Sequence, residues 1–153
     1  MNKVLADLVQ LLRLEPLEVN LFRGESRDIG SPQVFGGQVL GQALMAASET
    51  VEPARLVHSL HAYFLRRGDF NAPIVYEVDR SRDGTSFTNR RVVAIQHGKQ
   101  IFHMSASFQV QEDGPDHQAP MPDVAPPESL ADLATQQRNQ LERLPAEQRL
   151  FWC

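Results

Sequence analysis

The most apolar segment of the chain is residues 34–51, in which Glu49 is the only charged residue. At 3.6 residues per turn its three faces are all non-polar, and one of them consists of Gly37, Gly41 and Met45. A helix that is apolar on nearly every side is buried, and this one is too short and too rich in small residues to span a membrane, which takes about 20 apolar residues. The segment therefore predicts a buried helix with a sheet curled around it.

The segments on either side supply that sheet. Apolar residues at helical spacing predict an amphipathic helix over 2–14, which ends at Glu15-Pro16. Alternating positions predict strands at about 20–26, 56–66, 74–82, 85–97 and 99–111. Asp83-Gly84 and His97-Gly98 are typical hairpin turns. Consecutive strands with short links form an antiparallel sheet, so we expect an α+β hotdog fold, in which the sheet wraps around the central buried helix.

The remainder of the chain has a different character. Residues 112–127 contain five of the ten prolines and four acidic residues, which predicts an extended, acidic linker. Residues 128–144 have a weak helical stripe, and the sequence ends in Phe151-Trp152-Cys153. Two large aromatic residues directly after a helix suggest that a further element follows. We therefore expect a hotdog domain over 1–111, and a linker and helix over 112–153 that lead to a second hotdog domain.

Charge and composition narrow the class of protein. Residues 1–111 carry 12 Lys/Arg and 11 Asp/Glu, whereas residues 112–153 carry 3 and 8, so the net charge of -4 belongs to the tail. A near-neutral folded part predicts no nucleic-acid-binding surface, and no segment predicts membrane insertion. The single cysteine, Cys153, excludes an internal disulfide, and the N-terminus lacks a secretory signal. These features favour a reducing compartment, the cytoplasm.

Four ordered segments resemble the acyl-CoA thioesterase II family. They are Val34-Phe-Gly-Gly-Gln-Val-Leu-Gly-Gln-Ala-Leu, Leu56-Val-His-Ser-Leu-His-Ala-Tyr-Phe-Leu-Arg, Arg82-Asp-Gly-Thr-Ser-Phe and Arg91-Val-Val-Ala-Ile-Gln-His-Gly-Lys. The resemblance runs from about residue 5 to the end of the chain, and it implies two tandem hotdog domains that hydrolyse acyl-CoA to fatty acid and CoA. This chain would be the N-terminal hotdog and the linker.

The resemblance also implies where catalysis takes place. The family's aspartate, threonine or serine, and glutamine lie in the C-terminal hotdog, so no position of this chain matches them. The implied partners are an acyl-CoA substrate and a second hotdog domain or another copy of this chain, which makes a homo-oligomer the expectation; no cofactor is implied. The alternative is a non-catalytic acyl-CoA-binding or dimerisation module that works as a homodimer.

The start of the central helix is the first candidate for a substrate-binding site. Thioester hydrolysis needs a donor to the carbonyl oxygen, and a helix start offers free backbone N–H groups. Gly36 and Gly37 lack a Cβ, so a thioester carbonyl can approach closely, and Gln38 can add a side-chain donor. The structural alternative, which we favour, is that the glycines allow the helix to pack closely against the sheet.

His58 is the only candidate catalytic base. Its pKa range suits proton transfer near neutral pH. His58 and His61 are three residues apart, so a regular strand places them on opposite faces, which argues against a shared metal site. His58 would share a face with Leu60, Ala62 and Phe64, and such a histidine is more often buried and structural than catalytic.

Six arginines occur between residues 66 and 91, and arginine binds the phosphates of CoA well. We expect most of them to lie on a solvated outer face of the sheet, balanced by Glu77, Asp79 and Asp83. Arg66 and Arg67 are the exception, because they belong to a loop that can present charge at the mouth of a cleft.

Overall fold

The computed structural model describes residues 2–143. The chain divides into two compact units, Met1–Asp113 and Gly114–Cys153. No helix between residues 2 and 143 is both long and apolar enough to cross a membrane.

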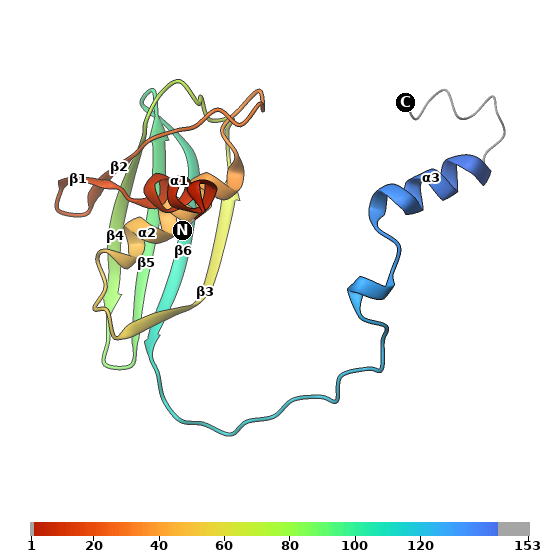
Figure 1. The fold of residues 1–153 in the computed structure, drawn as a ribbon. Helices are drawn as coiled ribbons and strands as arrows, with labels where there is room; N and C mark the ends of the chain where they lie inside the picture. The colour runs from red at the N-terminus through yellow and green to blue at the C-terminus, as the bar shows by residue number, and fades with distance from the viewer. Residues whose placement is uncertain (1, 144–153) are drawn as a thin grey trace. The chain divides into compact units, whose positions relative to one another are not determined.

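The first unit is a six-stranded antiparallel sheet with two helices (Figure 1). Its elements are α1 (Lys3–Leu12), β1 (Glu15–Glu18), β2 (Leu21–Gly24), α2 (Gly36–Ser48), β3 (Arg55–Phe64), β4 (Ile74–Asp83), β5 (Phe87–Gln96) and β6 (Lys99–Val110). The strand order is β1-β2-β4-β5-β6-β3, so the long strand β3 forms one edge. The predicted α+β architecture, an antiparallel sheet with one helix packed on it, is confirmed.

The core lies between α2 and one face of the sheet. Alternate residues of β5 and β6 point to α2 and are buried, and the other residues point away from it. The helix contributes Val39 and three fully buried alanines, Ala43, Ala46 and Ala47. Because alanine is small, the helix axis can lie close to the sheet.

The outward face of α2 is where the prediction was wrong. Gly37 and Met45 are exposed, because α1 is the only element of the described chain near this face, and it reaches only part of it. An added Cβ at Gly41 would lie 3.0 Å from Leu12 Cδ2 of α1. The other difference is that Gln38 and Gln42, which are polar, are buried. The helix is therefore buried on its sheet side and covered only in part by α1 on its outward face.

Two hairpins depend on residues with positive φ. Asn20, with φ of 63°, lies in the turn between β1 and β2. The sequence predicted a single strand in this region, at 20–26, and did not predict β1. Asparagine tolerates this left-handed conformation better than most residues, so it makes a tight turn possible. His97 and Gly98, with φ of 50° and 71°, join β5 to β6, as their sequence predicted.

Strand β3 contains a β-bulge at His58, which changes the alternation of its side chains. Val57 pairs with Phe108 and Ser59 pairs with Ser107, so His58 is an extra residue with no partner of its own. Past the bulge, Leu60 pairs with the core residue Ala106. Before the bulge the odd-numbered residues, such as Val57, point to the core face of the sheet, and after it the even-numbered residues, such as Leu60, do.

The second unit contains a 3-10 turn, η1 (Pro127–Ser129), and helix α3 (Leu133–Arg143). The predicted helix at 128–144 is confirmed over its second half. Its final residue, Leu144, and the aromatic residues Phe151 and Trp152 lie outside the described residues.

Candidate functional site

A cleft of about 520 Å³ lies at the N-terminal end of α2. The start of α2, the end of β3, the β3–β4 loop and the start of β6 form its walls. Its lining consists of Gln33, Val34, Gly36, Val39, Phe64, Leu65, Arg66, Arg67, Gly68, Ile101 and Phe102. The cleft thus brings together three of the predicted substrate-binding residues, Gly36, Arg66 and Arg67.

The two glycines at the start of α2 face aromatic rings. An added Cβ would lie 3.1 Å from Phe64 Cζ at Gly36 and 2.5 Å from Phe35 Cε1 at Gly37. Phe64 in turn packs on Phe102, with ring centroids 5.0 Å apart. Both glycines thus allow close packing, and Gly36 does so inside the cleft.

The helix start also leaves backbone donors available. Phe35 is the N-cap residue, and its side chain makes no capping hydrogen bond. The N–H groups of Gly36 and Gly37 have no hydrogen-bond partner among the described residues. Together with the partial positive charge of a helix N-terminus, they favour an electron-rich oxygen at this end of the cleft.

Arg66 and Arg67 add the charge. Arg66 Nη1 donates to the Gln100 carbonyl oxygen at 2.6 Å, which holds that guanidinium against the start of β6. The exposed Arg67 side chain has no hydrogen bond or ion pair within residues 2–143, so it can contact a ligand without losing a protein partner. Among the residues that the structure describes, no carboxylate and no histidine lines the cleft.

Gln96 anchors the loop that carries these arginines. Its side-chain amide donates to the carbonyl oxygens of Asp69 at 2.7 Å and Ala72 at 2.8 Å, and its oxygen accepts from Asp69 N–H at 2.8 Å. His97 Nε2 lies 3.1 Å from Asp69 Oδ2. The Asn71 backbone N–H, and then His97, hold the pKa of Asp69 below its usual value. Sequence reasoning missed Gln96, for which the only signal was a polar residue at a buried strand position.

Gln38 is not part of the cleft lining. Its Nε2 donates to the Glu25 carbonyl oxygen at 3.1 Å, so the side chain holds the loop after β2 against α2. The fully buried Gln42 acts in the same way: Nε2 donates to the carbonyl oxygens of Leu11 at 2.8 Å and Glu25 at 2.9 Å, and Oε1 accepts from Tyr76 Oη at 2.8 Å. Burial raises the pKa of Tyr76 far above its usual value.

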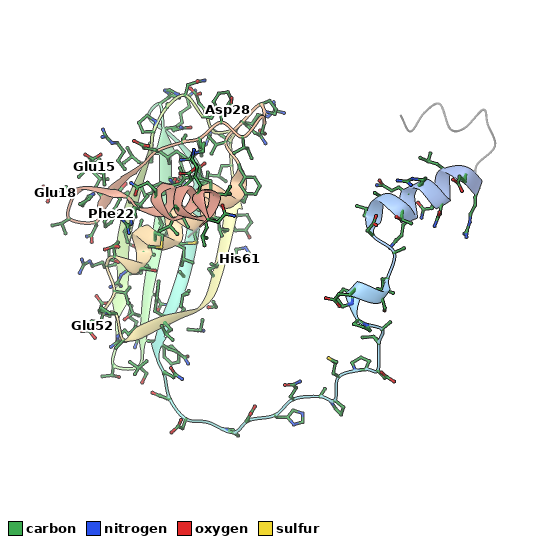
Figure 2. All side chains as sticks on the ribbon, viewed as in Figure 1. Glu15, Glu18, Phe22, Asp28, Glu52 and His61 are labelled. Atoms are coloured by element: carbon green, nitrogen blue, oxygen red, sulfur yellow. The ribbon has the colours of Figure 1, made fainter. Side chains whose placement is uncertain are left out.

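His58 lies away from the cleft. The β-bulge directs its ring to the face of the sheet opposite α2, where Nε2 lies 2.8 Å from Ser107 Oγ. His58 is exposed there, so the expectation of a buried histidine was wrong. His61 pairs with Ser105, two residues from Ser107, so both histidines occupy this face instead of opposite ones. Figure 2 shows His61 on β3.

Arg90 is buried, although most of the six arginines were predicted to lie on a solvated face of the sheet. It is 2% exposed and faces α2. Nε donates to Thr50 Oγ1 at 2.8 Å, and Nη2 donates to the Thr50 carbonyl oxygen at 2.9 Å and to Asp83 Oδ1 at 2.6 Å. This hydrogen bond from Arg90 lowers the pKa of Asp83. The adjacent Arg91 is exposed on the other face, because neighbours on a strand alternate.

The described residues contain no group of three or more His, Cys, Asp or Glu side chains that is arranged to hold a metal ion. The chemistry that the cleft offers is therefore hydrogen bonding from backbone amides, positive charge from two arginines, and an apolar wall.

Comparison with known proteins assigns the chain to a family. Residues 23–109 match the model of the acyl-CoA thioesterase N-terminal domain. Acyl-CoA thioesterase 2 of Haemophilus influenzae is 46% identical over 145 residues, which cover 95% of this chain and 51% of that protein. The crystal structure of an acyl-CoA thioesterase II from Mycobacterium marinum superposes with a TM-score of 0.70 at 50% identity, over 79% of this chain and 45% of that one.

A hotdog-fold protein from Alicyclobacillus acidocaldarius superposes with a TM-score of 0.69 at 25% identity, over 82% of this chain and 48% of that one. The predicted hotdog fold and the family resemblance are both confirmed. The chain spans about half the length of these proteins. It belongs to the acyl-CoA thioesterase family and corresponds to the family's N-terminal domain.

Proposed function

We propose that this chain is the N-terminal half of an enzyme that hydrolyses fatty acyl-CoA to free fatty acid and CoA, and that the cleft at the start of α2 helps to shape its substrate site. One observation carries the proposal. The same 520 Å³ space joins Gly36, whose helix N–H group is unpaired within the described residues, two arginines and an apolar wall. These match three parts of an acyl-CoA: a thioester carbonyl, phosphates and an acyl chain.

The parts of the cleft have distinct roles in this proposal. Arg66 and Arg67 bind CoA phosphates, because guanidinium groups form charge-assisted hydrogen bonds with them. The N–H group of Gly36 faces the thioester carbonyl oxygen and stabilises the negative charge that develops on it as water attacks, whereas Gly37 is not part of the cleft lining. The Gln38 side chain, which already donates to Glu25, supports the helix start and is not expected to contact the substrate.

The proton acceptor comes from outside this cleft. No group that lines it within residues 2–143 can remove a proton from water near neutral pH. The resemblance assigns the catalytic aspartate, threonine or serine, and glutamine to a second hotdog domain, so we propose that such a domain completes the enzyme. The exposed edge strand β3 is where it, or a second copy of this chain, would pair. We place the reaction in the cytoplasm, which the single cysteine supports.

Calorimetric titration of residues 1–153 with CoA tests the binding role. Arg67→Gln should weaken CoA binding by about ten- to a hundredfold, because one charge-assisted hydrogen bond contributes about 1.5–3 kcal/mol. Arg91→Gln is the matched control, since Arg91 is exposed on the opposite face of the sheet. Equal affinities of the two variants would contradict the assignment of the cleft.

Release of CoA from palmitoyl-CoA tests the catalytic role. We expect the chain alone to bind substrate with turnover near the background rate. This result also fits the alternative, which is a non-catalytic acyl-CoA-binding or dimerisation module. The lack of a base among the described residues that line the cleft favours this alternative. Restored turnover on addition of a second hotdog domain would exclude it. Turnover well above background that is lost in His58→Ala would show that His58 is catalytic after all.

A further inference from the structure

A second cavity, of about 270 Å³, lies at the opposite end of α2 from the cleft. The 13-residue helix separates the two by about 20 Å. Its lining consists of Thr50, Glu52, Arg55, Arg80, Asp83, Thr88 and Arg90. Figure 2 labels Glu52 at this end of the unit, and Asp28 at the other. None of the roles proposed for the cleft uses this cavity.

Arg90 forms the fixed wall of this cavity and has no donor to spare. Besides its bonds to Thr50 and Asp83, Nη1 donates to the carbonyl oxygens of Arg82 at 3.2 Å and Asn89 at 2.9 Å. The guanidinium therefore joins the end of α2 to β4 and β5. It also occupies Oδ1 of Asp83, so this acid is already committed to a cation.

Arg55 differs, because part of its charge has no partner. Its side chain is 13% exposed, Nη2 donates to the Thr85 carbonyl oxygen at 3.0 Å, and Nε lies 3.7 Å from Glu52 Oε2. The third nitrogen, Nη1, is buried and has no hydrogen-bond partner among residues 2–143. A buried donor on a charged group is costly to leave unpaired, so such an atom points to a ligand.

Arg80 supplies a second cation with free capacity. Its Nε donates to Asn20 Oδ1 at 2.7 Å, and its two terminal nitrogens make no hydrogen bond or ion pair within residues 2–143. The lining then carries three arginines against two acids, of which Asp83 is bound to Arg90 and Glu52 is 81% exposed. The cavity thus has an excess of positive charge and unpaired guanidinium donors.

We propose that this cavity binds a phosphate group, with the guanidinium groups of Arg55 and Arg80 as its donors. Arginine is well suited to phosphate, because its planar group offers several N–H donors in a fixed arrangement. A volume of about 270 Å³ is several times the about 30 Å³ that one water molecule occupies in the liquid, so there is room for a phosphate group.

Titration of the full chain with inorganic phosphate at constant ionic strength, followed by ¹⁵N NMR of the arginine Nε–H groups, tests this site without any acyl-CoA. Saturable shifts of the Arg55 and Arg80 resonances are expected. Arg55→Gln and Arg80→Gln should each weaken binding about tenfold, and Arg91→Gln should leave it unchanged. Arg80 is exposed, so Arg80→Gln remains informative if Arg55→Gln does not fold.

A parallel titration with AMP identifies the source of the phosphate group. Tighter binding of AMP than of inorganic phosphate would indicate a nucleotide, and equal or weaker binding would indicate free phosphate; either result supports a phosphate site. Shifts that do not saturate, or that are the same in Arg80→Gln and Arg91→Gln, would overturn the proposal. Because the cleft residues are unchanged in every variant, this result is independent of the acyl-CoA experiments.

Discussion

Replacing Gln42 by leucine tests whether the buried polar network holds the first unit together. The substitution keeps the size of the side chain roughly constant but removes its three hydrogen bonds, to Leu11, Glu25 and Tyr76. At about 1 kcal/mol for each bond, with a further cost for the buried Tyr76 hydroxyl that loses its partner, we expect the free energy of unfolding to fall by about 3–4 kcal/mol. This is a large share of the roughly 5–15 kcal/mol that stabilises a typical domain.

Urea denaturation followed by circular dichroism measures this loss, and a second substitution makes the test specific. Tyr76→Phe alone should cost about 1–2 kcal/mol, because it leaves Gln42 Oε1 without its donor. In the Gln42→Leu background the same change should cost nothing or stabilise, because it removes the unpaired hydroxyl. The control is Gln10→Leu, at an exposed helical position. A Gln42→Leu cost below about 1 kcal/mol, or simple additivity with Tyr76→Phe, would refute the reasoning.

Three further predictions concern the cleft, the response to alkaline pH and the sheet edge. Gly36→Ala should displace the Phe64 ring, which lies 3.1 Å from the new Cβ, and weaken acyl-CoA binding in calorimetry with little loss of stability; unchanged affinity would contradict this. The raised pKa of Tyr76 disfavours the phenolate in the folded state, so its contribution to stability is complete below about pH 10, the pKa of an unfolded tyrosine, and is lost as pH rises above it. Unfolding free energies from pH 8 to 11 should therefore fall more steeply for the native chain than for Tyr76→Phe, and parallel curves would exclude this. The chain should self-associate in light scattering through edge strand β3, and Leu60→Lys should shift it to monomer; a monomeric native chain would contradict the edge-pairing proposal.

The sequence was sufficient to predict the architecture, because the apolar helix at 34–51 needs a sheet to pack on, and the alternating strands form a sheet with one apolar face. The turn at His97-Gly98 was likewise predictable from local chemistry, since glycine next to a residue that tolerates positive φ favours a tight hairpin. Arg66 and Arg67 could be assigned to the mouth of a cleft, because they belong to the loop at the end of a long strand.

Two of the failures have a common physical cause, which is that burial of polar groups depends on partners distant in sequence. Arg90 is buried because Thr50 and Asp83 bond to it, and no local pattern shows these contacts. Gln42 is buried for the same reason, since its partners lie 17, 31 and 34 residues away. His58 was misplaced because a β-bulge leaves no reliable mark on the alternation of side chains.

The bulge at His58 also determines which changes of length strand β3 can accept. Since Val57 and Ser59 pair with the consecutive residues Phe108 and Ser107, removing His58 would leave every pair on either side of it in place. Removing Leu60 instead would take an apolar side chain from the face that pairs with Ala106 and would turn residues next to the gap to the opposite face. Position 58 is therefore the point in this strand at which a one-residue deletion leaves the fold intact.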